Sequence, residues 1–165
     1  MAVFPAMSPC VAPEKRPSVN NATESPNPAP TNATVKRATL RLYVSALATG
    51  CRTLDIFAST GTLNENVKWN NQAFGTSTNN PASNTRTDFI QVGTAPCTNS
   101  TLNTYVTGWD VTADVVKIAA GTATNNGWMI RDDTENSATP QLNVFSSREA
   151  AVLARAPQLI VTYTT

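Results

Sequence analysis

The sequence predicts an all-β fold, an antiparallel and jelly-roll-like β-sandwich with one short helix near residues 113–120. Three observations support this prediction. Thr and Asn make up about a quarter of the chain, and they favour strands and tight turns respectively. From Val35 onwards apolar residues recur at every second position, which is the period of a half-buried strand. Finally, 11 Pro and 7 Gly punctuate the chain, as in folds built from many short strands.

The apolar runs predict the strands in chain order. In the clearest run, Leu40 and Leu42 alternate with Arg41 and Tyr43, so one face of that strand is expected to be buried. A polar loop rich in Thr, Ser, Asn and Pro is expected at residues 75–87. The predicted strands cover residues 38–45, 54–58, 67–69, 89–92, 105–111, 128–130, 142–145 and 159–163.

One helix is expected between Thr112 and Gly121. Thr112 is placed to cap its first turn, Asp114 lies within that turn, and Gly121 is placed to end it. The residues between them provide an apolar face of about two turns, made of Val115, Val116, Ile118 and Ala119.

Residues 1–34 are expected to form a Pro-rich N-terminal arm or a residual strand, with the sandwich in residues 35–165. Six Pro residues occur from Pro9 to Pro30, a density that no sheet ladder or helix tolerates. This stretch is therefore expected to be extended and similar to polyproline II, with a disordered linker as the alternative. Ala2, Val3 and Phe4 can form a short strand before it.

Composition excludes several classes of function. A chain of 165 residues without any His cannot use Ser-His-Asp or Cys-His catalysis or imidazole metal ligands. A net charge of +1 removes the electrostatic argument for a nucleic-acid partner, and no apolar run approaches the ~20 residues of a membrane span. The remaining carboxylate pair, Asp110 and Asp114, suits helix capping better than acid–base catalysis. We therefore expect a protein that is not an enzyme.

Three cysteines allow one disulfide and one further thiol. The candidates are Cys10, Cys51 and Cys97, and the sequence alone does not choose among the three pairings. The Cys51–Cys97 pair is favoured because both residues lie in segments typical of turns. Three unpaired, partly buried thiols are the alternative.

Six short motifs follow one another along the predicted sandwich. They are Ala38-Thr39-Leu40-Arg41-Leu42-Tyr43-Val44, Val67-Lys68-Trp69-Asn70-Asn71-Gln72, Trp109-Asp110-Val111-Thr112, Asn126-Gly127-Trp128-Met129-Ile130-Arg131-Asp132, Ser147-Arg148-Glu149-Ala150 and Pro157-Gln158-Leu159-Ile160-Val161-Thr162-Tyr163. Together they resemble a known family, the DNRLRE domain, which is similar to carbohydrate-binding module family 96. The resemblance covers roughly residues 35–165. It implies a secreted, non-catalytic sandwich of the kind found attached to bacterial polysaccharide-degrading enzymes and cell-surface proteins, some of which bind acidic polysaccharide.

The resemblance leads to two hypotheses of function. Members of the family usually begin with two or three further strands, and residues 2–7 look like the end of the last one. The chain is then either a fragment or a subunit that another chain completes. The first hypothesis is an extracellular or cell-surface module that binds polysaccharide or serves as a structural domain. The alternative is a self-assembling subunit of an extracellular filament or particle, whose N-terminal arm adds a strand to a neighbouring copy.

Four residues are the candidates for ligand binding: Arg41, Tyr43, Asp55 and Phe57. Each falls on the strand phase opposite to the apolar residues around it, such as Leu40. If they share one sheet face, they form a patch that can bind a saccharide or a partner protein. Arg in such a patch suits the carboxylate of a uronic acid.

The other charged candidates have structural interpretations. Arg148 and Glu149 are expected to take part in a structural ion pair, with uronic-acid recognition by the arginine as the alternative. Asp132, Asp133 and Glu135 offer the oxygen ligands that Ca²⁺ prefers, although a solvated turn is the favoured interpretation. No other cofactor is expected.

The three tryptophans, Trp69, Trp109 and Trp128, lie in apolar alternation. Core packing is therefore favoured for them over stacking on a sugar ring.

Overall fold

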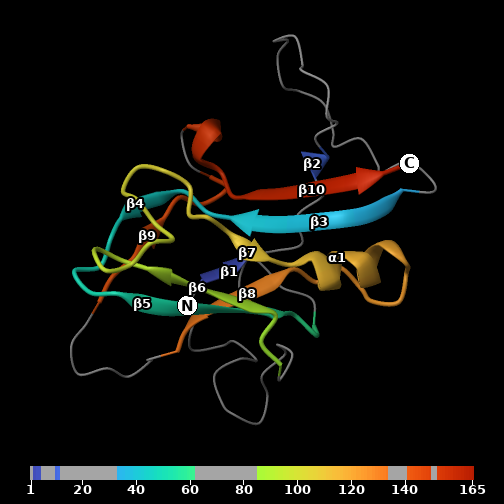
Figure 1. The fold of residues 1–165 in the computed structure, drawn as a ribbon, viewed down its shortest axis with the longest axis horizontal. Helices are drawn as coiled ribbons and strands as arrows, with labels where there is room; N and C mark the ends of the chain where they lie inside the picture. Colours follow the sequence, from blue (N-terminus) through green and yellow to red (C-terminus); the bar gives the residue numbers. More distant parts are fainter. Residues whose placement is uncertain (1, 5–9, 12–32, 62–84, 134–140, 150–151) are drawn as a thin grey trace.

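The strands form two facing layers, as the computed structural model in Figure 1 shows for residues 2–4, 10–11, 33–61, 85–133, 141–149 and 152–165. The first sheet has the order β1-β8-β5-β6, the second has the order β2-β10-β3-β7, and β4 and β9 form a separate pair. The bounds are β1 (Ala2–Phe4), β2 (Cys10–Val11), β3 (Thr34–Arg41), β4 (Val44–Ala46), β5 (Arg52–Ala58), β6 (Asp88–Val92), β7 (Trp109–Asp110), α1 (Thr112–Ala119), β8 (Trp128–Asp132), β9 (Val144–Phe145), a 3₁₀ turn at Leu153–Arg155 and β10 (Gln158–Thr164). The all-β prediction is confirmed.

Most neighbouring strands are antiparallel, as predicted. The ladder between β3 and β10 runs from Thr34 opposite Thr164 to Arg41 opposite Gln158. In the first sheet, β5 is central and pairs with β6 on one side and β8 on the other. The exception is β2, which lies parallel to β10.

The core fills the space between the two sheets. The predicted alternation along β3 is confirmed, because Ala38 and Leu40 are fully buried. They belong to one continuous apolar cluster that also contains Ile56 of the first sheet and Trp109 of the second. Side chains of both sheets therefore share one core, and burial of this apolar surface is the main stabilising contribution to the fold.

Helix α1 lies within one residue of the predicted range, but it begins differently. Thr112 does not cap it, since Val111 occupies the N-cap position and no side chain caps that end. The Thr112 hydroxyl instead accepts a hydrogen bond from the backbone N–H of Ala38, at 2.8 Å, and so ties the helix to β3. The predicted end is confirmed, because Gly121 has a φ of 71° directly after the last turn.

Two predicted strands are shorter than expected. Of residues 105–111 only β7 is a strand, together with an isolated bridge between Tyr43 and Tyr105. Gly108 has a φ of 97°, a left-handed conformation that turns the backbone before Trp109 and interrupts the ladder. Of residues 142–145 only β9 is a strand. The predicted strand at 67–69 lies outside the described residues, as does most of the predicted loop at 75–87.

The N-terminal segment contributes a strand to each sheet. Ala2–Phe4 forms β1, as expected, and pairs antiparallel with β8 from Ala2 opposite Ile130 to Phe4 opposite Trp128. Cys10 and Val11 form β2 beside β10. Both strands are outermost in their sheets, so they lie on edges that would otherwise expose backbone donors and acceptors. The last residue of the expected arm, Thr34, already belongs to β3, and residues 1, 5–9 and 12–32 lie outside the described residues.

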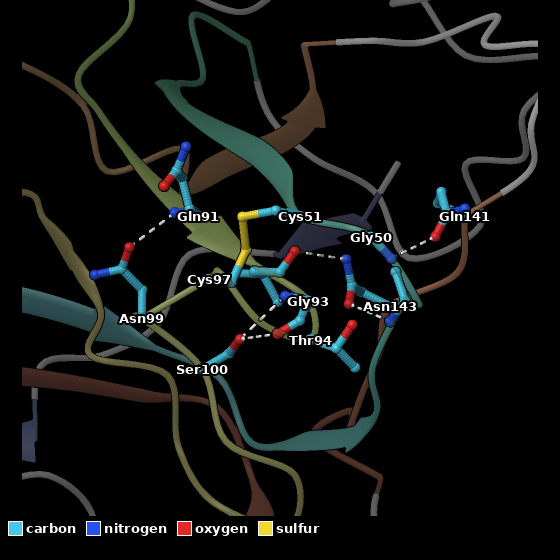
Figure 2. Close-up of a disulfide and its surroundings, with 12 residues drawn as sticks. Gly50, Cys51, Gln91, Gly93, Thr94, Cys97, Asn99, Ser100, Gln141 and Asn143 are labelled. Carbon is cyan, nitrogen blue, oxygen red and sulfur yellow. Dashed lines mark hydrogen bonds between the residues drawn. A yellow bond between two sulfur atoms is a disulfide. The ribbon is translucent and has the colours of Figure 1, made fainter.

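The favoured cysteine pair is present as a disulfide. Cys51 and Cys97 are bonded, with their Cα atoms 5.4 Å apart, and the bond joins the residue before β5 to the loop after β6 (Figure 2). The chains approach closely here, since a Cβ on Gly93 would overlap the carbonyl oxygen of Gly50. Gly93 also has a φ of 144°. Both the close approach and the backbone conformation therefore require glycine at this position.

Polar side chains around the disulfide satisfy the loop backbone. The Gln141 side-chain oxygen accepts from the N–H of Gly50 at 3.0 Å, and the Ser100 hydroxyl accepts from the N–H of Gly93 at 3.0 Å (Figure 2). The Asn99 side chain likewise accepts from the N–H of Gln91, on the edge strand β6, at 3.0 Å. Loop and edge-strand amides without ladder partners need such acceptors. Hydrogen bonding to such amides is one physical role for the many uncharged polar residues of this chain.

Removal of the disulfide is expected to lower the free energy of unfolding by about 4 kcal/mol. This value follows from the 46-residue separation of Cys51 and Cys97 and the loop-closure entropy of the unfolded chain. Urea denaturation of a Cys51→Ala, Cys97→Ala variant measures the loss. A Cys10→Ala background in both proteins prevents exchange with the third thiol. A loss below about 1 kcal/mol would contradict the expectation.

Candidate functional site

Two tyrosines pack together where β3 ends. Tyr43 follows Arg41, the last residue of β3, and forms a backbone bridge with Tyr105. Their ring centroids are 5.5 Å apart, with the planes at 87° to each other. This edge-to-face arrangement is favourable for aromatic pairs, and it gives the pair a fixed geometry at the surface.

Two arginines cover this aromatic pair. The Arg41 Cζ lies 4.7 Å from the Tyr105 centroid, and the Arg155 Cζ lies 5.0 Å from the Tyr43 centroid. Both distances are in the cation–π range. We call Arg41, Tyr43, Tyr105 and Arg155 the tyrosine–arginine cluster.

The guanidinium of Arg41 is held in position by a neutral partner. Its Nε donates to the Gln158 side-chain oxygen at 2.9 Å. In the described part of the chain, neither Arg41 nor Arg155 forms an ion pair. The cluster therefore presents two positive charges that no carboxylate of the described residues neutralises.

Tyr105 anchors the cluster to the segment that carries Arg155. Its hydroxyl donates towards two backbone carbonyl oxygens, that of Ala154 at 2.7 Å and that of Ala156 at 2.8 Å. Burial raises the pKa of Tyr105, the neighbouring Tyr43 acts in the same direction, and the positive charge of Arg41 opposes them. The neutral, proton-donating phenol is thus the favoured form.

The predicted four-residue patch does not form, because its members belong to different sheets. Asp55 and Phe57 lie on β5 of the first sheet, whereas Arg41 lies on β3 of the second. Phe57 was expected at the surface, yet only 5% of it is exposed, and it packs with Met129 in a small apolar cluster separate from the main core. Strand phase identifies the face of a sheet but not what covers that face, which is why the expectation for Phe57 was wrong.

Asp55 is also occupied by a structural contact. It is 6% exposed, and its Oδ1 accepts from the Arg86 Nη1 at 2.9 Å. The Arg86 Cζ lies 4.3 Å from the Phe89 centroid. A buried carboxylate requires a partner such as the Arg86 guanidinium. This ion pair therefore stabilises the outer face of the first sheet.

The tyrosine–arginine cluster contains two residues that sequence reasoning missed. Tyr105 was assigned to a strand without a role, and Arg155 was not singled out. Their contacts with Tyr43 and Arg41 join segments far apart in the chain. The alternation of a single strand carries no information about such contacts.

The proposed calcium ligands include one that is already bound. Asp132 accepts from the Nε of Arg52 at 2.8 Å and from its Nη2 at 3.0 Å. Asp133 is exposed, and Glu135 lies outside the described residues. Within the described ranges, no three His, Cys, Asp or Glu side chains are placed to hold a metal ion. The bidentate ion pair favours a structural role for Asp132.

Arg148 and Glu149 pair with each other. The Arg148 Nε lies 2.9 Å from Glu149 Oε1, with 64% and 78% of the two side chains exposed. An ion pair this exposed contributes little to stability.

Two of the three tryptophans are core residues, as predicted. Trp109 is fully buried, and its indole N–H donates to the Leu54 carbonyl oxygen at 2.9 Å. Trp128 is also buried and donates to Asp114 Oδ2 at 2.9 Å. Trp69 lies outside the described residues.

The two carboxylates considered for catalysis accept hydrogen bonds instead. Asp110 Oδ1 accepts from the backbone N–H of Thr112 at 2.9 Å, next to the start of α1. Hydrogen bonds from the side chain and backbone of Thr112 lower the pKa of Asp110, and the charge of Arg37 adds to this effect. Asp114 accepts from Thr87 and Trp128. Asp114 thus has a packing role, and neither carboxylate is the N-cap of α1, since Val111 holds that position.

A pocket of about 560 Å³ lies beside α1, where β5 ends and β8 begins. It is lined by Ala58, Ser59, Thr60, Thr85, Arg86, Thr87, Ala113, Asp114, Lys117, Ile118, Ala123, Thr124, Asn126, Gly127 and Trp128. Its volume is within the range of small-molecule sites.

Comparisons with protein families, curated proteins and solved structures found no significant similarity to this chain. The resemblance to the DNRLRE domain therefore remains a prediction from the motifs. None of the helices in the described ranges is long and apolar enough for a membrane crossing.

The raised pKa of Tyr105 predicts a pH dependence of stability. A raised folded-state pKa gives stability that is fully present below the ordinary value of 10.0 and is lost as the pH rises through the folded value. Tyr105→Phe lacks the ionising group but also loses the hydrogen bond, which is worth about 1 kcal/mol. At about pH 8 the wild-type protein should therefore have a higher free energy of unfolding than Tyr105→Phe. This difference in free energy should shrink towards about pH 11. Urea denaturation across this range measures it, and a constant or growing difference would contradict the assignment.

Proposed function

We propose that this protein is a non-catalytic, extracellular β-sandwich module that binds acidic polysaccharide through the tyrosine–arginine cluster. One observation carries the proposal. Arg41 and Arg155 are positioned on a tyrosine pair and have no ion-pair partner among the described residues.

The cluster has the chemistry that a uronic acid requires. A guanidinium can donate two parallel hydrogen bonds to one carboxylate, and its planar shape allows this while it stacks on an aromatic ring. The hydrogen bond from Arg41 to Gln158 uses Nε and leaves the terminal nitrogens for a ligand. Tyr43 and Tyr105 supply apolar ring surface beside the charges, suited to the C–H groups of a sugar.

Two further observations support an extracellular, non-catalytic role. The Cys51–Cys97 disulfide is of a kind that persists in oxidising compartments. The absence of His from the sequence removes the commonest general base, and Asp110 and Asp114 are used in hydrogen bonds.

Binding to alginate, a polymer of uronic acids, tests the proposal. Arg41→Ala and Arg155→Ala are each expected to weaken binding about tenfold, since a charge-assisted hydrogen bond is worth about 1.5–3 kcal/mol. Isothermal titration calorimetry at low ionic strength measures the dissociation constants. Added salt should weaken binding by the parent protein.

Arg148→Ala is the matched control, because Arg148 is also an exposed arginine but pairs with Glu149. Its affinity for alginate should equal that of the parent. Absence of alginate binding by the parent, or equal losses in all three variants, would overturn the proposal.

Self-assembly is a second candidate, favoured by the position of the N-terminal strands. β1 and β2 have three and two residues and lie on the outer edges of β8 and β10. Such short ladders contribute few hydrogen bonds, and a neighbour's strand can occupy the same edge by β-strand addition. Head-to-tail contacts of this kind propagate into filaments unless the ring closes.

Light scattering of the full chain at micromolar concentration tests self-assembly. The expected result is a polymer that Val3→Pro converts to monomers, because proline cannot donate within the β1–β8 ladder. Val3→Thr keeps the backbone N–H and should still polymerise. A monomeric parent protein would exclude this candidate.

A further inference from the structure

The pocket beside α1 is a second site with chemistry unlike that of the tyrosine–arginine cluster. It lies between α1, the end of β5 and the start of β8. In Figure 1 these elements are at one end of the sandwich, and β3 runs away from them towards its last residue, Arg41. The two sites are thus at opposite ends of the strands and use no residue in common.

A carboxylate in the pocket wall is held in a fixed orientation. Asp114 Oδ2 accepts from Trp128 Nε1 and from the Thr87 hydroxyl, each at 2.9 Å. The other oxygen, Oδ1, has no hydrogen-bond partner among the described residues. Trp128 is buried in the core, so its indole is itself fixed. Asp114 therefore keeps one acceptor oxygen oriented without any cost of ordering when a ligand binds.

The remaining polar groups of the wall include both donors and acceptors. Lys117 follows Asp114 by three positions on α1 and therefore lies on the same side of the helix. Hydroxyl groups come from Thr87 and other Thr and Ser residues, and Asn126 adds an amide. Short apolar patches, such as those of Ala58 and Ile118, lie between these groups. A ligand with many hydroxyls and small C–H faces would match such a wall.

The charges of the pocket favour an uncharged ligand. The carboxylate of Asp114 is balanced by the ammonium of Lys117 in the same wall. Arg86, another lining residue, is already paired with Asp55. An anionic or cationic ligand would therefore meet charges of both signs, whereas a neutral polyol could donate to Asp114 and accept from Lys117.

We propose that this pocket binds a neutral sugar residue, with Asp114 accepting hydrogen bonds from sugar hydroxyls and Lys117 donating to a sugar oxygen. This site is independent of acidic-polysaccharide binding at the tyrosine–arginine cluster. Either of the two sites can exist without the other.

Nuclear magnetic resonance titration of the ¹⁵N-labelled full chain tests the proposal. The probes are the methyl glycosides of glucose, galactose, mannose and xylose, with galacturonate and glucosamine as charged counterparts. At least one neutral glycoside should shift the amide signals of Ser59, Thr87 and Lys117 at about millimolar concentration, and signals near Tyr105 should not move.

Two variants assign the interaction to the pocket. Asp114→Asn keeps an oxygen that can accept from Trp128, and Lys117→Met changes an exposed helix position, so both should fold. Each should weaken binding of the neutral glycoside at least tenfold. Arg155→Ala, in the other site, should leave that affinity unchanged.

Three results would overturn the proposal. The first is that no neutral glycoside in the set moves the pocket signals. The second is tighter binding of galacturonate or glucosamine than of their neutral counterparts. The third is unchanged glycoside binding in both Asp114→Asn and Lys117→Met.

Discussion

The indole of Trp109 is the contact on which the arrangement of the two layers depends. Its ring is fully buried in the shared core, and it belongs to β7 of the second sheet. Its N–H donates to the Leu54 carbonyl oxygen on β5 of the first sheet. Hydrophobic burial alone has no direction, whereas this hydrogen bond fixes where one sheet lies over the other. Loss of the indole would leave a cavity and remove this hydrogen bond between the sheets.

The same residue sets the positions of both candidate sites. Gly108 turns the chain just before Trp109, and Tyr105 of the tyrosine–arginine cluster lies three residues before that turn. Three residues after Trp109, Thr112 bonds to Ala38 of β3 and starts α1, which carries Asp114 into the pocket wall. A single buried side chain therefore holds the segment between an exposed cationic cluster and a polar pocket.

Sequence reasoning succeeded where one local pattern decided the structure. The alternation around Leu40 predicted a buried strand face, and Gly121 predicted the end of α1, because both depend on short-range geometry. It failed where a segment distant in the sequence determines the burial or the hydrogen-bond partner of a side chain. Phe57 has the phase of a surface residue but is covered, and Thr112 has the chemistry of a helix cap but bonds to β3 instead. Half of the tyrosine–arginine cluster was missed for the same reason, since no local pattern connects Arg155 with Tyr43.

The low charge of the chain limits how the tyrosine–arginine cluster could attract an acidic ligand. Charged residues are 14% of the sequence and the net charge is +1, so no long-range field draws a polyanion towards the protein. Three other arginines have carboxylate partners: Arg52 with Asp132, Arg86 with Asp55 and Arg148 with Glu149. The proposed recognition of an acidic polymer would then depend on contact-range interactions, since beyond about 8 Å salt screens the remaining charges at physiological ionic strength. Arg41 and Arg155 are already positioned on the tyrosine pair. Their side chains would therefore lose little conformational entropy when a ligand binds.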